Sequence, residues 1–241
     1  MSQSIRGMGT KRLEDQTYDT ITLLGEVEFP FETSVNHIKM TGEITALDQI
    51  DIDKINLIGN FTGHKSAHVT TASIIGEVEV AENLTFELLK VTGTIETPAN
   101  LNGNKLKLIG GLKTAGHCEV DELNINGRVE VKGMLNADTI DITVQQDSYA
   151  REIGGNIIKI RRQEKEKKKF KLITVISTQK EPAYLTTEVI EGDRIEVNRV
   201  KAKVIRGDHI ILHEDVEVET VEYTKTLECA QSAKINQITK Q

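Results

Sequence analysis

Glycine recurs at one fixed spacing through the first half of the chain, and this spacing constrains the fold more than any other feature. The glycines in register, which define a 17-residue repeat, are Gly25, Gly42, Gly59, Gly76, Gly93, Gly110 and Gly127. The chain has 18 glycines in 241 residues, so seven at one spacing is not a chance pattern. A fixed period of this kind indicates a repeat architecture in which each unit packs on its neighbours.

The apolar positions within each 17-residue unit fall in pairs, with one residue between the two members. In the second unit the pairs are Val35 with Thr33, Ile38 with Met40, and Ile44 with Ala46. A spacing of two indicates a strand with one buried face. Three short strands separated by corners predict a triangular coil, and stacked coils predict a β-solenoid. The seven glycines are predicted to occupy a corner that needs positive φ or close backbone approach.

Composition supports a narrow β-solenoid over a helical repeat. Aromatic residues make up 4% of the chain and Trp is absent, which favours a thin core of Val, Ile and Leu. The units are rich in β-branched residues and carry a central glycine, which disfavours helices. Eight coils at a strand spacing of about 4.8 Å predict a rod of roughly 38 Å.

The strict period and the absence of long loops resemble the bactofilin family of bacterial cytoskeletal proteins. Three runs carry the resemblance, at residues 39–44 (KMTGEI), 73–78 (SIIGEV) and 124–129 (NINGRV), within a region spanning about 17–143. Left-handed hexapeptide helices differ, because their coils advance by multiples of six. The resemblance implies a right-handed parallel β-helix that polymerises end to end without nucleotide. It also implies a scaffold role, often at a membrane.

The register fades after the eighth unit, and four regions are predicted. Residues 1–16 form a polar tail, 17–144 a β-helix of about eight coils, 145–187 a charged insertion or hairpin, and 188–241 a second, less regular β-helical stretch. Gly192 and Gly207 lie 15 apart, whereas Ile195 and Leu212 lie 17 apart. The second stretch either stacks on the first rod, and so caps it, or folds back beside it.

A cluster of positive charge lies in the predicted insertion. The cationic residues are Lys159, Arg161, Arg162, Lys165, Lys167, Lys168, Lys169 and Lys171. A solvated hairpin tip or short helix is the favoured interpretation. Contact with an anionic membrane surface is the second, and nucleic-acid contact is third because Phe170 is the only aromatic residue among these charges. The chain carries a net charge of −7, which gives no general case for nucleic-acid binding.

The first coil is a candidate self-association site, because uncapped solenoid ends pair with other chains. Phe29 and Phe31 flank Pro30 in that coil and are candidate contact residues. Local packing within the coil is the favoured alternative for both rings.

Catalytic chemistry is not indicated by any motif. Nucleotide, dinucleotide and serine-hydrolase motifs are absent from the sequence. His117 lies about three coils, or roughly 15 Å, from the coils of His64 and His68. Cys118 falls on an apolar position, which indicates a buried thiol. Outward glutamates such as Glu26, Glu43 and Glu77 indicate a solvated face. We expect no enzyme activity, metal, cofactor or small-molecule substrate.

The predicted function is self-assembly as a structural scaffold through the rod ends. The expected partners are other copies of the chain, with a membrane surface or envelope-associated proteins as further candidates and no nucleic acid. The alternative is a non-polymerising protein-binding module whose C-terminal half caps the rod. The two cysteines form no disulfide framework. With no signal peptide evident, we expect a cytoplasmic protein, with the inner membrane surface as a second location.

Overall fold

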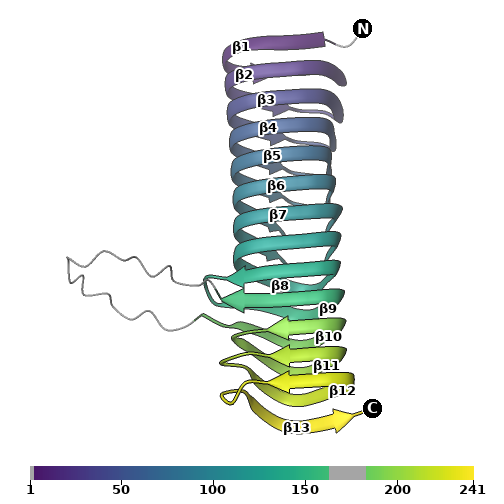
Figure 1. Cartoon of the computed structure of the whole chain (residues 1–241). Helices are drawn as coiled ribbons and strands as arrows, with labels where there is room; N and C mark the ends of the chain where they lie inside the picture. Colours follow the sequence, from purple (N-terminus) through teal and green to yellow (C-terminus); the bar gives the residue numbers. More distant parts are fainter. Residues whose placement is uncertain (1–2, 163–182) are drawn as a thin grey trace, which may run out of the picture.

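The computed structural model describes residues 3–162 and 183–241, and these form one continuous parallel β-solenoid (Figure 1). Its 13 strands lie in a single sheet in sequence order, each paired with the strands before and after it. The strands are β1 Gln3–Arg12, β2 Thr17–Phe29, β3 Thr33–Ala46, β4 Ile50–Gly63, β5 Ala67–Val80, β6 Leu84–Thr97, β7 Leu101–Thr114, β8 Cys118–Val144, β9 Ser148–Arg162, β10 Leu185–Val197, β11 Val200–Leu212, β12 Glu217–Cys229 and β13 Lys234–Lys240. The predicted all-β parallel solenoid is confirmed.

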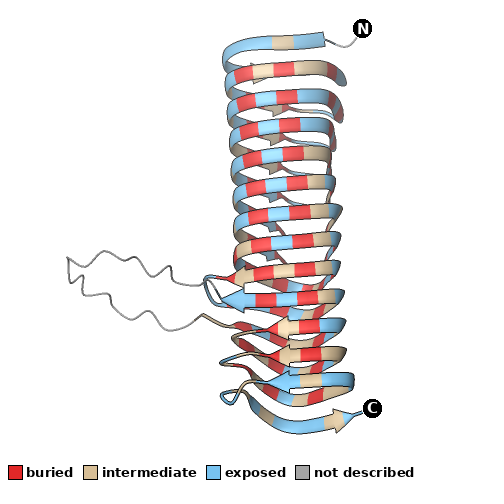
Figure 2. Cartoon of the chain, in the orientation of Figure 1, coloured by how far each residue is buried: buried red, intermediate tan, exposed pale blue. Residues whose placement is uncertain are grey.

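Each regular strand runs through two corners, so one strand is nearly one coil. In β3 the buried residues are the three predicted pairs, separated at the corners by exposed or half-buried residues. We call the side bearing Thr33 and Val35 the first face. The sides bearing Ile38 with Met40, and Ile44 with Ala46, are the second and third faces. The same alternation of buried and exposed residues continues along the rod (Figure 2).

Stacking places like residues over like residues in the regular part of the rod. Ile21 pairs with Ile38, and Ile38 pairs with Ile55, so the register follows the glycine period. All three side chains are at most 1% exposed. Full burial of an aliphatic side chain contributes about 1.5–3 kcal/mol, so these columns supply the main stabilisation that a single coil cannot reach alone.

The predicted corner glycines form a column at the corner between the second and third faces. Gly42 has a φ of +134°, which L-residues rarely adopt. A Cβ added to Gly42 would lie 1.8 Å from the carbonyl oxygen of Gly25 in the preceding coil. The column therefore needs glycine for both its backbone conformation and its close approach.

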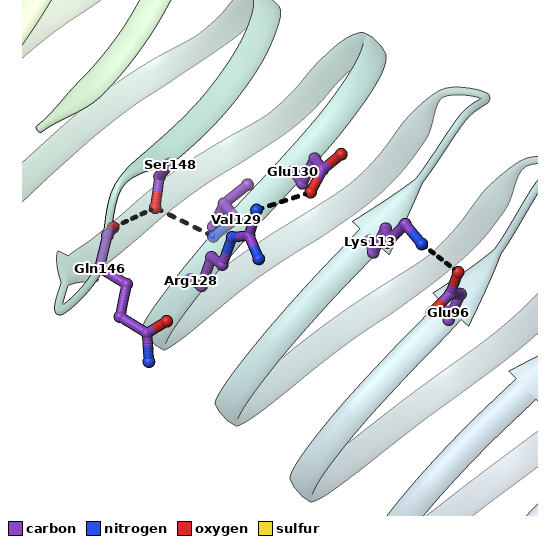
Figure 3. Close-up of polar contacts among 7 residues, drawn as sticks. All are labelled: Glu96, Lys113, Arg128, Val129, Glu130, Gln146 and Ser148. Atoms are coloured by element: carbon purple, nitrogen blue, oxygen red, sulfur yellow. Dashed lines mark hydrogen bonds and ion pairs between the residues drawn. The ribbon is translucent and has the colours of Figure 1, made fainter.

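Buried hydroxyl groups are satisfied at other corners. Thr114 Oγ1 donates to the Ala99 carbonyl at 2.6 Å and accepts from the Gly116 N–H at 3.1 Å. Ser148 Oγ accepts from the Val129 N–H at 3.1 Å and donates to the Gln146 carbonyl at 2.9 Å (Figure 3). The Ser148 bonds join β8 to β9, the Thr114 bonds join β7 to the preceding coil, and neither hydroxyl is left unpaired.

The domain boundaries differ from those predicted. Within the predicted polar tail, Gln3–Arg12 forms β1, which pairs in parallel with β2 and adds a coil. The predicted insertion at 145–187 contains β9, so the stack continues to Arg162. The 188–241 region stacks directly on β9 and extends the same rod. The rod therefore includes about 13 strand spacings, or about 60 Å, instead of eight coils.

The C-terminal coils are shorter and less uniform than the first ones. Gly192 pairs with Gly207, and Ile195 pairs with Ile210. The strands β10 and β11 are therefore paired at the 15-residue spacing of Gly192 and Gly207. The 17-residue spacing of Ile195 and Leu212 does not correspond to a strand pairing. A register shift also occurs between β11 and β12. Between β9 and β10 the pairing passes from Ser148 to Leu185, because residues 163–182 intervene in the sequence.

Candidate functional site

The two ends of the rod expose residues that belong to the core columns. Within the described residues, β1 pairs only with β2 and β13 only with β12. Ile5 stacks on Ile21, and Ile238 stacks on Val221. Ile21 and Val221 are fully buried, but Ile5 is half-buried and Ile238 is 53% exposed. Figure 2 shows both terminal strands as largely exposed. Each end therefore presents open backbone groups and unfinished apolar columns.

The predicted aromatic contact site is divided between core and surface. Phe29 is fully buried and packs edge-to-face on Tyr18, with ring centroids 6.2 Å apart. It is therefore part of the core of β2, which β1 covers on the N-terminal side, and it is not available for an intermolecular contact. Phe31 is 53% exposed at the corner after the third face. The structure does not bring the two rings together as one surface.

Part of the predicted basic cluster lies on the second face of β9. Lys159 is exposed, and Arg161 pairs with Asp141 of the preceding coil. This hydrogen bond raises the pKa of the Arg161 guanidinium above its ordinary value. Arg162 ends β9 and is exposed. Residues Lys165, Lys167, Lys168, Lys169 and Lys171 lie outside the described residues.

The outward glutamates lie on the third face, as the alternation predicts. Some are in ion pairs, such as Glu96 with Lys113 of the next coil and Glu130 with Arg128 of its own strand at 2.9 Å (Figure 3). Others are exposed and in no ion pair among the described residues, namely Glu43, Glu77 and Glu79. Pairs between exposed groups contribute at most about 1 kcal/mol.

The second face also carries an exposed apolar row that was not predicted. The residue directly before each column glycine points outward, and in five coils it is apolar with more than half of its surface exposed. These residues are Met8, Leu24, Ile58, Ile75 and Ile109. The signal was present in the sequence, because the row has the same 17-residue period as the glycines from Leu24 onward.

Metal-ligating side chains are not gathered into a site in the part of the chain that the structure describes. No group of three or more His, Cys, Asp or Glu residues is placed to hold a metal among residues 3–162 and 183–241. Cys118 is fully buried, and burial raises the pKa of its thiol to about 12, as expected for a core residue. Cys229 is exposed. The same residues include no helix long and apolar enough to cross a membrane.

Comparison with known proteins identifies partial relatives. No family model matches the chain, and neither does any solved structure. The chain is similar to two Bacillus subtilis (strain 168) proteins, YhbE and YhbF, both described as uncharacterized. Identity to YhbE is 37% over 94 residues, which are 39% of this chain and 37% of YhbE. Identity to YhbF is 33% over 95 residues, 39% of this chain and 35% of YhbF. The similarity thus spans little more than a third of either relative.

Proposed function

We propose that this protein is a structural scaffold that assembles end to end through the two termini of its solenoid, without nucleotide or cofactor. The observation that carries the proposal is the pair of unfinished core columns at β1 and β13. An exposed strand edge offers unpaired backbone groups to another strand. Joining two rods also covers apolar side chains that the isolated rod leaves in water. The resemblance to bactofilins supports the same assignment.

The proposal assigns the molecule a mechanical role, with no catalytic step and no small-molecule substrate. The partner at each end is another copy of the chain. We propose the cytoplasm as its location, and the inner membrane surface is the second location to test. The capped-module alternative has less support, because the C-terminal half extends the stack and its last strand keeps a free edge within the described residues.

Electron microscopy of the purified full chain tests end-to-end assembly. The unmodified chain is compared with variants that carry a charged side chain in the apolar column at one end of the rod. Lys is placed at Ile5 or at Ile238 (Ile5→Lys, Ile238→Lys). Each ammonium group stays hydrated in the single rod but would be buried by a joined rod, at a cost of several kcal/mol. We expect long filaments from the unmodified chain and short rods from these variants.

Asp51→Lys is the matched control, because Asp51 is exposed on the first face of β4, on the side of the rod instead of the end. It should leave filament length unchanged. Discrete single rods from the unmodified chain, at all concentrations and salt levels, would refute end-to-end assembly.

A further inference from the structure

The second face of the first seven strands has an unusual charge distribution for a chain with a net charge of −7. On β1–β7 its outward positions from Arg6 to Ile109 carry no Asp or Glu. They carry five lysines and one arginine. These are Arg6, Lys39, Lys54, Lys90, Lys105 and Lys107. Together with the apolar row, these residues form a surface that we call the basic face. Strand spacing gives it a length of about 29 Å.

Most of these cations are in no ion pair among the described residues. Lys105 pairs with Glu122, but Lys39, Lys90 and Lys107 are exposed and make no such pair. The C-terminal coils differ, since Arg206 there pairs with both Glu191 at 3.0 Å and Glu222 at 2.7 Å. Lys39, Lys90 and Lys107 are therefore available to a partner, whereas many charges in the C-terminal coils are already paired.

The neighbouring third face of the same coils has the complementary charge. Its outward glutamates, which we call the acidic face, are Glu26, Glu28, Glu43, Glu77, Glu79 and Glu96. Arg12 and Lys113 also lie on this face, where they pair with Glu28 and Glu96 of neighbouring coils. The other four glutamates are in no ion pair among the described residues. The two faces meet at the glycine column, and both repeat at the strand spacing of about 4.8 Å. The basic rows of one rod can therefore match the acidic rows of a second rod along their whole length, because both rods have the same spacing between coils.

Three rows run along each face, and their order decides how two rods fit. On the basic face the two basic rows, containing Lys54 and Lys39, come first and the apolar row with Ile58 comes last. On the acidic face the two acidic rows, containing Glu43 and Glu79, come first and an exposed apolar row comes last. That last row contains Leu47, Ala81, Pro98 and Ala115 at the corner after the third face, with His64 as its polar member.

Facing surfaces of two antiparallel rods run in the same chain direction, so their rows meet in the same order. Both basic rows then lie against acidic rows, and the apolar row lies against the apolar row. In a parallel pair the order reverses, and an apolar row lies against charge. We propose that the basic face docks on the acidic face of a second, antiparallel copy of this chain, forming lateral layers of rods.

A flat anionic membrane fits this surface less well. Carboxylates border the basic face on both sides, with Asp53 and Glu87 at the corner toward the first face and Glu43 and Glu77 beyond the glycine column. A bilayer wide enough to cover the face would approach these rows as well, with like-charge repulsion. An antiparallel second rod places its two acidic rows against the two basic rows, and the two cations on its acidic face, Arg12 and Lys113, are already paired with Glu28 and Glu96.

The contact is expected to be weak for a single pair of rods. A strip of about 29 Å by about 15 Å projects to roughly 400 Å² on each rod, whereas a standard interface buries about 800 Å² per partner. Rods already joined end to end multiply this contact. Strong lateral association therefore rests on the proposed function, although weak pairing of single rods does not. Because the contact is heterologous, it repeats from rod to rod.

Charge reversal on the full chain tests the proposal. One variant is Lys39→Glu/Lys90→Glu/Lys107→Glu on the basic face, and the other is Glu43→Lys/Glu77→Lys/Glu79→Lys on the acidic face. All six side chains are exposed and in no ion pair among the described residues, so both variants should fold. At low salt each variant alone should lose bundles in electron microscopy. The low-speed sedimenting fraction should fall by about tenfold or more.

An equimolar mixture of the two variants should restore bundles, because each rod of one kind then meets complementary faces of the other. About 1 M salt should separate wild-type bundles into single filaments. Bundles that survive either reversal, or a mixture that fails to restore them, would overturn the proposal. So would loss of binding to anionic vesicles on reversal of the basic face without loss of bundles, which would assign this face to lipid.

Filament length and bundle width are read from the same images, so lateral and end-to-end failure are distinguishable. Single long filaments without bundles contradict the lateral contact alone. Short rods that pair side by side at high concentration contradict end-to-end assembly alone.

Discussion

At the residue scale, the column glycines are required because the coils leave no space for a Cβ atom at this corner. In each regular coil, the place where a side chain would begin is occupied by a carbonyl oxygen of the preceding coil. For Gly59 the separation between an added Cβ and the Gly42 oxygen would be 1.8 Å, and φ is +138°. Neither obstacle can be relieved by rotating a side chain, since both involve only backbone.

We expect Gly59→Ala to lower the free energy of unfolding by about 3 kcal/mol. Gly111→Ala is the control, because its added Cβ would lie 3.5 Å from the Thr94 methyl group, an ordinary contact. That variant should lie within about 0.5 kcal/mol of the unmodified chain or be slightly more stable. Denaturant unfolding measures both, and equal effects would show that the column does not require glycine.

Cys118 links stability to alkaline pH. Burial raises the pKa of its thiol from an ordinary value of 9.0 to about 12 in the folded chain. Above pH 9 the unfolded chain loses this proton while the folded chain keeps it, so stability falls as pH rises. At about pH 10 the loss from this group is about 1.4 kcal/mol.

The free energy of unfolding is measured against pH for the unmodified chain and for Cys118→Ala. The difference between the two slopes gives the contribution of the thiol, because other groups that titrate above about pH 9 are present in both proteins. The difference in slope should appear only above about pH 9. Parallel slopes for the two proteins would contradict a protonated, buried Cys118.

At the scale of the strand, a coil depends on having neighbours on both sides. Ile55 in β4 is 1% exposed between two coils, whereas Ile238 in β13 is 53% exposed at an end. We expect Ile55→Ala to cost about 2–5 kcal/mol and Ile238→Ala less than about 1 kcal/mol. Chemical denaturation of non-assembled protein gives both values. Similar losses would mean that the terminal coil is covered in solution.

The fold was predictable from the sequence for coils that share one period, and it was not where the period changes. The apolar pairs of β3 identify all three faces, because each pair must be buried by the coils above and below it. In β10 and β11 the true partners are Ile195 and Ile210, yet Leu212 is equally apolar and suggests the longer period of the first coils. The strand β1 escaped prediction because its exposed, polar residues pair through backbone groups.

The candidate surfaces were less predictable than the fold. That Phe29 points inward follows only from the register of its coil, and its proximity to Phe31 in sequence was misleading. The basic face requires knowing which positions share a side of the rod. Lys39 and Lys107 are distant in the sequence but lie on the same row, joined by the strand pairings from β3 to β7.

For the whole molecule, the three proposed elements of function are spatially separate. The ends carry unfinished apolar columns, one side carries exposed cations, and the adjacent side carries exposed carboxylates. End contacts are apolar and tolerate salt, while side contacts are ionic and do not. A single rod about 60 Å long can therefore grow in length and in width under separate control.

The end of the glycine column also determines where foreign sequence can enter the rod. Gly127 is followed at this corner by Val144 and then by Arg162, which pair with each other. Strand β9 ends at Arg162, and the stack resumes in β10 from Leu185. The corner is closed by backbone contact as far as Gly127, where an added Cβ would lie 1.7 Å from the Gly110 carbonyl oxygen. The spacing of paired residues also changes here, from 18 between Ile140 and Ile158 to 15 between Gly192 and Gly207. A segment grafted between Arg162 and Leu185 is therefore expected to disturb the stack less than one placed at a column glycine.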